Sequence, residues 1–261
     1  MSFSLLDVRD RLGVQPGRMF IGGRWVDWDG PRFDQVSPAT NEVMTSFAEA
    51  GRRGVDMAVA AARRAFDEGP WPRMAAQDRK RMLQRIIERI YDAEEELAQL
   101  QTLDNGIPYH FSRNSRLSGK ACADIFDHYA GWIDKLTGET YPQFSSASNM
   151  HYMSFREPVG VVGAILAWNG PLIMFAMKAG PALACGNTVV VKPSEYTNLA
   201  VTRLAEIIAD SDLPPGVFNF VTGGAEAGNA LATHPGVDKV SFTGSPAVGE
   251  KIMSAAGSNM K

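Results

Sequence analysis

Short apolar runs alternate with helical patterns in the second half of the chain. Continuous runs rich in Val, Ile and Phe lie at 160–166, 187–192, 216–221 and 238–242, and amphipathic stretches follow them at 171–184, 199–209, 226–232 and 246–256. Apolar runs without polar alternation are typical of strands buried on both faces, and the helices between them are typical of parallel-sheet crossovers. The fold class predicted is therefore α/β, with a doubly wound, mostly parallel sheet and flanking helices. Ligands of such sheets bind at the carboxyl ends of the strands.

The first half of the chain has a different pattern. Two short strands around Gly22 and Gly23, a turn and another extended piece predict a small N-terminal β element. Apolar residues then recur at helical spacing over 55–66, 76–102 and 117–136, which predicts three amphipathic helices. The segment 138–158 carries Ser and Asn between two extended pieces, a composition typical of a hairpin, with a surface loop as the alternative.

Charge and hydropathy exclude two classes of function. The 261 residues include 26 basic and 29 acidic side chains, and the net charge of -3 gives no field that would hold a nucleic-acid backbone. No apolar run reaches the roughly 18 residues of a membrane span. Nucleic acid and membrane are therefore not expected as partners.

Cysteine and histidine usage indicates the compartment. Two cysteines, Cys122 and Cys185, cannot build a disulfide framework, and with four scattered histidines they form no zinc-type pattern. The N-terminal sequence MSFSLLDVRDRLG carries four charged residues where a secretory signal would be apolar. We therefore expect a cytoplasmic protein without a metal site.

Polar residues follow the predicted strands at the ends where a ligand would bind. Asn169, after the first strand, has a side-chain amide that can stabilise an oxyanion, or it can cap the helix that follows. After the second strand, Lys192 can donate to ribose hydroxyls or phosphate. Glu195 can accept from a vicinal diol and would repel a 2′-phosphate. A solvated charged turn is the alternative for both residues.

Glycines surround the start of the helix after the fourth strand. Gly244 and Gly249 lie where backbone N–H groups and the helix dipole suit a pyrophosphate, or they serve only for packing. The fingerprint G-x-G-x-x-G is absent, since Gly223, Gly224 and Gly228 miss its spacing. A standard dinucleotide assignment therefore does not follow from the glycines alone.

Four segments of the chain together resemble the N-terminal part of the aldehyde dehydrogenase superfamily. They read TLDNGIPY, WNGPLIMFAMKAGPALACGNTVVVKPSE, LPPGVFNFVTGG and DKVSFTGSPAVG, and the likeness covers nearly all of the chain. The resemblance implies an oxidoreductase that converts an aldehyde to a carboxylic acid with NAD, or alternatively NADP. It also implies a Rossmann-like fold and a hairpin arm for assembly into dimers or tetramers.

The resemblance carries roles onto individual positions. Asn169 matches the residue that stabilises the oxyanion of the covalent intermediate and is the expected catalytic residue. The expected cofactor-binding residues are Ile165, Ala167, Trp168, Lys192, Ser194, Glu195, Gly228, Gly244, Ser245 and Gly249.

The resemblance also divides the chain. Residues 1–137 match the first part of the cofactor-binding domain, 138–158 the oligomerisation arm, and 159–261 the NAD-binding core. The catalytic domain, with the nucleophilic cysteine and the general-base glutamate, lies beyond Lys261 in the family pattern. We therefore expect the chain to be inactive alone and completed by a C-terminal half, with a non-catalytic NAD-binding module or an assembly partner as the alternative. Cys122 and Cys185 are expected to be buried and structural.

Overall fold

A single six-stranded sheet organises the molecule. The computed structural model describes residues 17–143 and 149–257. The strand order is β10-β7-β8-β9-β1-β2, in which β10, β7, β8 and β9 are parallel to one another and β1 pairs antiparallel with both β9 and β2. The strands are β1 (Arg18–Ile21), β2 (Arg24–Asp27), β7 (Val161–Ile165), β8 (Thr188–Lys192), β9 (Phe218–Phe220) and β10 (Lys239–Phe242).

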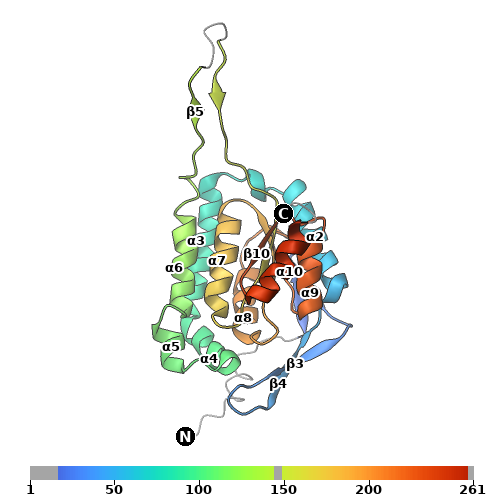
Figure 1. Ribbon diagram of the computed structural model, residues 1–261. Helices are drawn as coiled ribbons and strands as arrows, with labels where there is room; N and C mark the ends of the chain where they lie inside the picture. Colours follow the sequence, from blue (N-terminus) through green and yellow to red (C-terminus); the bar gives the residue numbers. More distant parts are fainter. Residues whose placement is uncertain (1–16, 144–148, 258–261) are drawn as a thin grey trace.

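Helices cover both faces of this sheet (Figure 1). One face packs against α7 (Pro171–Ala184) and α8 (Leu199–Ala209), through residues such as Val162 and Val189, and α3 (Ala76–Asp92) and α6 (Gly119–Ala130) pack against these two helices. The other packs against α2 (Gly51–Asp67), α9 (Ala225–Thr233) and α10 (Pro246–Gly257), through residues such as Val161 and Val190. The predicted doubly wound α/β architecture is confirmed, and β1 and β2 join the main sheet instead of forming an element of their own.

Smaller elements lie around this body. The hairpin of β3 (Arg32–Val36) and β4 (Val43–Ala48), the 3₁₀ turn Trp71–Arg73 and the helices α4 (Glu94–Asn105) and α5 (Tyr109–Asn114) complete the first half. Strands β5 (Thr140–Tyr141) and β6 (Tyr152–Met153) pair antiparallel and form the arm that projects from the body in Figure 1. The hairpin predicted for 138–158 is confirmed, although 144–148 at its centre lie outside the described residues.

Three predictions from the pattern were wrong. The helix expected over 76–102 is divided at Ala93, where the chain turns so that α4 packs against α8. The helix expected over 117–136 ends at Ala130, and Trp132 and Leu136 beyond it are exposed instead of joining the core. Strand β10 is not buried on both faces, because it is the edge strand of the sheet.

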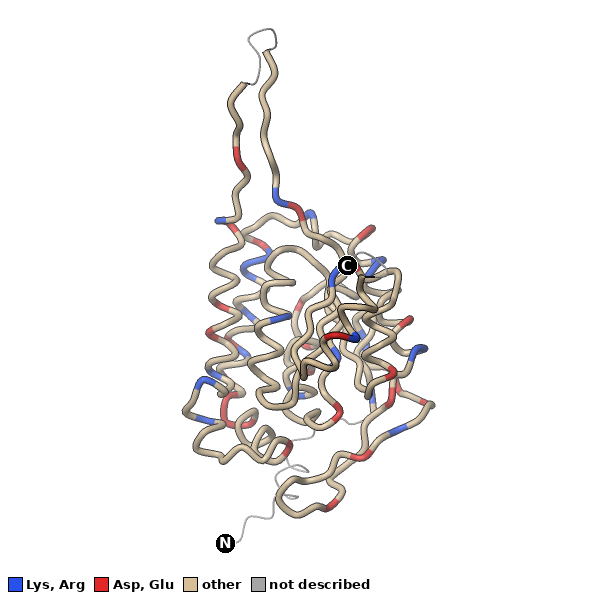
Figure 2. The backbone as a smooth tube through the Cα atoms, in the orientation of Figure 1, with Lys and Arg blue, Asp and Glu red and all other residues tan. Residues whose placement is uncertain are grey.

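Basic and acidic positions are interspersed along the described backbone and do not separate into regions of one sign (Figure 2). This distribution agrees with the small net charge of -3. None of the helices in residues 17–143 and 149–257 is long and apolar enough to cross a bilayer.

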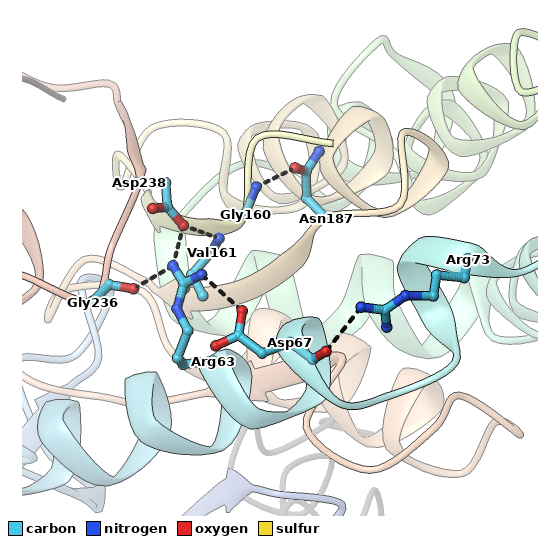
Figure 3. A network of polar contacts seen from close by, with 8 residues as sticks. All are labelled: Arg63, Asp67, Arg73, Gly160, Val161, Asn187, Gly236 and Asp238. Atoms are coloured by element: carbon cyan, nitrogen blue, oxygen red, sulfur yellow. Dashed lines mark hydrogen bonds and ion pairs between the residues drawn. The ribbon is translucent and has the colours of Figure 1, made fainter. Parts of the chain in front are cut away.

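A polar network fixes the start of β7 (Figure 3). The Asp238 carboxylate accepts from the Val161 backbone N–H at 2.7 Å and from the Arg63 guanidinium, which also donates to the Gly236 carbonyl at 3.1 Å. Gly160 has a φ of 128°, and a side chain there would collide with the Asp238 carboxylate. The network therefore links α2, β7 and the loop before β10, and it requires glycine at position 160.

We predict that Asp238→Ala destabilises the protein by about 1–3 kcal/mol, because the buried Val161 N–H loses its acceptor. The matched control is Asp67→Ala, which removes the other carboxylate paired with Arg63 at an exposed position. The control should change the free energy of unfolding by less than about 0.5 kcal/mol. Urea denaturation measures both values, and equal effects of the two substitutions would contradict the assigned role of Asp238.

Candidate functional site

The carboxyl ends of the parallel strands lie side by side in register. Ile165 pairs with Lys192 of β8 on one side and with Phe242 of β10 on the other. Backbone hydrogen bonds extend this alignment beyond the strands, from Leu166 N to the Lys192 carbonyl at 3.0 Å and from Thr243 N to the Ile165 carbonyl at 3.3 Å. The loops after β7, β8 and β10 therefore meet at one edge of the sheet, around the point between β7 and β10 where the strand order reverses.

The loop after β7 carries the predicted oxyanion residue. Ile165 is buried, Ala167 is half-buried, and Trp168 and Asn169 are exposed. Gly170 and Pro171 then begin α7, without a side-chain cap on this helix. The alternative that Asn169 merely caps α7 is not supported, because its side chain makes no capping bond and faces solvent.

The solvated-turn alternative fails for Lys192, which is buried at the end of β8, whereas Glu195 in the loop that follows is half-exposed. Lys192 is 4% exposed, and its ammonium donates to the Gly223 carbonyl and, at 3.4 Å, to the Gly224 carbonyl. Burial lowers the pKa of Lys192 to about 8, although the carboxylates of Glu195 and Glu49 partly offset this shift. The ammonium group therefore ties the end of β8 to the loop after β9.

Beside Lys192, Ser194 is buried and its Oγ accepts from the Tyr196 N–H at 3.4 Å. Glu195 is half-exposed, and its backbone carbonyl accepts from the side-chain amide of Asn198 at 3.0 Å. The Glu195 backbone is thereby fixed while its carboxylate can reach solvent. This is the arrangement that a carboxylate needs to accept hydrogen bonds from a diol.

Glu49 is a residue of this region that the sequence analysis missed. Its carboxylate accepts from the Gly224 N–H at 2.8 Å and from the Gly51 N–H at 3.2 Å. It thus holds the turn between β9 and α9 from the side of β4. Its position directly after β4 could have indicated a residue at a strand end. However, β4 lies in a hairpin outside the main sheet, so its end was not expected near the site.

The glycines near these loops have close packing contacts with neighbouring side chains. A Cβ at Gly228 would lie 3.7 Å from Lys192 Cε, so this buried glycine lies against the lysine stem. A Cβ at Gly244 would overlap the ring of Phe242. Ser245 is exposed, and its carbonyl accepts from the Gly249 N–H at 2.9 Å in the first turn of α10. Packing therefore accounts for glycine at 244, and the exposed loop leaves room for a ligand.

Among the residues that the structure describes, no three His, Cys, Asp or Glu side chains gather in a way that could hold a metal ion.

Comparison with known families identifies the chain. The sequence model described as the aldehyde dehydrogenase family matches residues 25–261. The chain belongs to the aldehyde dehydrogenase family.

Individual relatives agree with this assignment. Aldehyde dehydrogenase family 2 member B4, mitochondrial, of Arabidopsis thaliana is 46% identical over 95% of this chain and 46% of its own length. Aldehyde dehydrogenase, cytosolic 1, of Mus musculus is 42% identical over 96% of this chain and 50% of its own. The structure of an aldehyde dehydrogenase from Bacillus cereus in complex with NAD+ has a TM-score of 0.91 at 39% identity, covering 97% of this chain and 51% of that one. The chain therefore spans about half the length of the relatives it matches.

The two cysteines of this aldehyde dehydrogenase chain have unreactive surroundings. Cys122 is fully buried in α6, and burial raises the pKa of its thiol far above the ordinary value. Cys185 is half-buried at the end of α7. Burial raises its pKa as well, although the nearby charges of Arg79 and Lys239 act in the opposite direction. Neither thiol has the lowered pKa that a nucleophile needs.

Asp104, at the end of α4, is a buried carboxyl group close to these loops. Its Oδ2 accepts from the Leu199 N–H at 2.8 Å, and its Oδ1 has no hydrogen-bond partner among the described residues. Burial raises the pKa of Asp104 to about 8, although N–H groups at the start of α8 partly offset this shift. The folded protein therefore binds a proton at Asp104 more tightly than the unfolded chain does.

We predict that Asp104→Asn reduces the loss of stability at alkaline pH. A carboxyl group with a raised pKa contributes stability that is complete below its ordinary pKa and lost as pH rises through about 8. The amide cannot ionise, so the variant should lose less free energy of unfolding than the unsubstituted protein between about pH 5 and pH 9. Urea denaturation across this range measures the difference. Asp124→Asn is the control, since the pKa of exposed Asp124 is lowered, and it should show no such difference.

Proposed function

We propose that this chain is the cofactor-binding half of an enzyme that oxidises an aldehyde to a carboxylic acid with NAD. The observation that carries the proposal is the register of β7 with β8 and β10, which aligns the loops of Asn169, Lys192 to Glu195 and Gly244 to Gly249 at one edge of the sheet. The family and the NAD+ complex of the Bacillus cereus relative support it. NADP is the alternative cofactor.

The residues present suit a dinucleotide chemically. The half-exposed Glu195 offers a carboxylate to the vicinal hydroxyls of a ribose, next to the cation of Lys192. The exposed residues Gly244 and Ser245 lead into α10, whose N-terminal N–H groups suit the negative charge of a pyrophosphate. Ile165, Ala167 and Trp168 would line the cleft, with Ser194, Gly228 and Gly249 in the surrounding loops.

The chain's own contribution to the chemistry is the amide of Asn169. Its side-chain N–H would donate to the oxyanion that forms when a thiolate adds to the aldehyde carbon. Because an amide does not titrate near neutral pH, this donor works independently of protonation. When bound, NAD would accept the hydride that leaves this carbon.

The nucleophilic thiol and the general base are proposed to belong to a C-terminal half. The burial and raised pKa values of Cys122 and Cys185 support this division, as does the coverage of half of each relative. We place the chain in the cytoplasm and expect homo-oligomers formed through the β5–β6 arm, on which Met153 and Phe155 are exposed. A non-catalytic NAD-binding module is the second proposal, because two unreactive thiols are equally consistent with a chain that only binds NAD.

We predict that the 261-residue chain by itself binds NAD and produces no NADH from any aldehyde. Fluorescence titration measures the binding, and absorbance at the NADH band measures turnover. NADH formation that is lost in Cys185→Ser would contradict the division between the halves. Recovery of activity on addition of a C-terminal half favours the enzyme over the binding module.

Sedimentation of the same sample tests the role of the β5–β6 arm in assembly, and a monomer would contradict that role.

We predict that Glu195→Gln reduces the preference for NAD over NADP by about fivefold, because loss of one negative charge near a 2′-phosphate removes a repulsion on the order of 1 kcal/mol. The matched control is Glu88→Gln, which neutralises an exposed carboxylate on α3. The dissociation constants of the two cofactors measure the ratio. An unaltered ratio in Glu195→Gln would remove the argument for NAD preference.

A further inference from the structure

The C-terminal end of α4 is held rigidly inside the first half of the chain. Leu97, Leu100 and Leu103 of this helix are buried in the main apolar cluster. The side-chain amide of Gln101 donates to the Leu117 carbonyl at 3.0 Å. The helix ends at Gly106, whose N–H donates to the Thr102 carbonyl at 3.0 Å. The last two residues of α4, Asp104 and Asn105, therefore have fixed positions.

Asp104 holds the loop after β8. Its carboxyl group accepts from the Leu199 N–H at the first residue of α8, which directly follows that loop. Gln35 of β3 supports the same loop from another side, because its amide donates to the Tyr196 carbonyl at 2.7 Å. Asn198 donates to Gln35 Oε1 at 3.1 Å and to the Glu195 carbonyl. The backbone that presents Glu195 is thus fixed by buried side chains of α4 and β3.

Asn105 holds the loop after β7. Its side-chain amide donates to the carbonyl of Trp168, the oxygen of the peptide group that includes the Asn169 nitrogen. Trp168 is 55% exposed, and Asn169 is exposed as well, so side-chain packing restrains this loop little. The orientation of the Trp168–Asn169 peptide group therefore depends on the amide of Asn105.

We propose that Asp104 and Asn105 are positioning residues that hold the two ends of the dinucleotide site at a fixed separation. The inference rests on the proposed function, in which Glu195 serves the ribose end and Asn169 the reacting end. Consecutive Cα atoms are about 3.8 Å apart and cannot separate. The two loops lie about 25 residues apart in the sequence and still further from α4. Both are thus held by neighbouring residues at the end of one rigid helix.

This assignment gives the loss of Asn105 a specific consequence. Loss of the Asn105 amide frees the Asn169 peptide group and leaves the Glu195 loop fixed by Asp104 and Gln35. Misplacement of an oxyanion donor lowers the rate of the chemical step with little change in cofactor binding. A purely structural Asn105 would instead change stability and all kinetic constants together.

The first test uses NMR of the unliganded chain with Asn105→Ala. We expect the order parameter of the Asn169 backbone N–H to fall from the rigid range of about 0.85 to below about 0.6, with no change at Glu195. Asn114→Ala is the matched control, since among the described residues this exposed amide bonds to His110 of the same helix. It should leave both positions unchanged. An unchanged order parameter at Asn169 in Asn105→Ala overturns the proposal.

The second test uses the enzyme completed by its C-terminal half. Asn105→Ala should lower kcat by about tenfold with the KM for NAD changed less than about twofold, as expected for a displaced transition-state donor. Asn105→Asp, which keeps the size and loses the donor, should behave in the same way and covers the case in which the alanine variant does not fold. Equal losses in kcat and in NAD affinity, or no loss in either, overturn the proposal.

Failure of the proposed function gives a different result. An unsubstituted enzyme that neither binds NAD nor oxidises aldehydes contradicts the function. The order parameter of Asn169 still decides whether Asn105 holds the loop.

Discussion

The parallel, in-register pairing of β7 with β8 and β10 is the constraint on which the site depends. Ile165 faces Lys192 and Phe242 across the two ladders, so three loops begin at the same level of the sheet. Because β7 and β8 are buried on both faces, a slip of one residue would exchange their side chains between two apolar clusters of different composition. The Asp238–Val161 contact fixes the opposite end of β7, where Gly160 has no room for a side chain. The register is therefore determined at both ends of the strand.

Electrostatics then connects the loops that the register aligns. The Lys192 ammonium is nearly fully buried and donates to carbonyls of the next loop, while Glu49 accepts from the N–H of Gly224 in that same loop. A buried cation with a carboxylate in its neighbourhood is less costly than either charge alone, although its lowered pKa shows that desolvation still prevails. The turn after β9 is thus held through its backbone, by Lys192 at the carbonyls of Gly223 and Gly224 and by Glu49 at the Gly224 N–H. These contacts use no side chain of the turn itself.

The proposed division between binding groups and a reactive thiol agrees with the same architecture. Residues 17–143 and 149–257 supply strand ends, helix N-termini and a neutral amide, which are groups that bind and orient. The two thiols of the chain are held in α6 and at the end of α7, where burial raises their pKa values. Binding groups and an activated nucleophile place opposite demands on solvation, since a thiolate needs a polar or positive surrounding that a close-packed helix interior does not provide. A separate polypeptide region for the thiol agrees with these demands.

The amino-acid sequence by itself determined the four parallel strands, the helices after them and the hairpin arm, because local periodicity and turn residues carry this information. It also placed Asn169, Lys192, Glu195 and Gly244 at strand ends. The break at Ala93, the end of α6 at Ala130 and the exposure of β10 came from packing against distant elements, which no local pattern encodes. The contacts of Glu49, Asp104 and Asn105 with the loops join residues about 60 to 180 positions apart. Only the tertiary structure decided them, because hydrogen bonds between such remote residues depend on how the layers meet and leave no periodic trace in the chain.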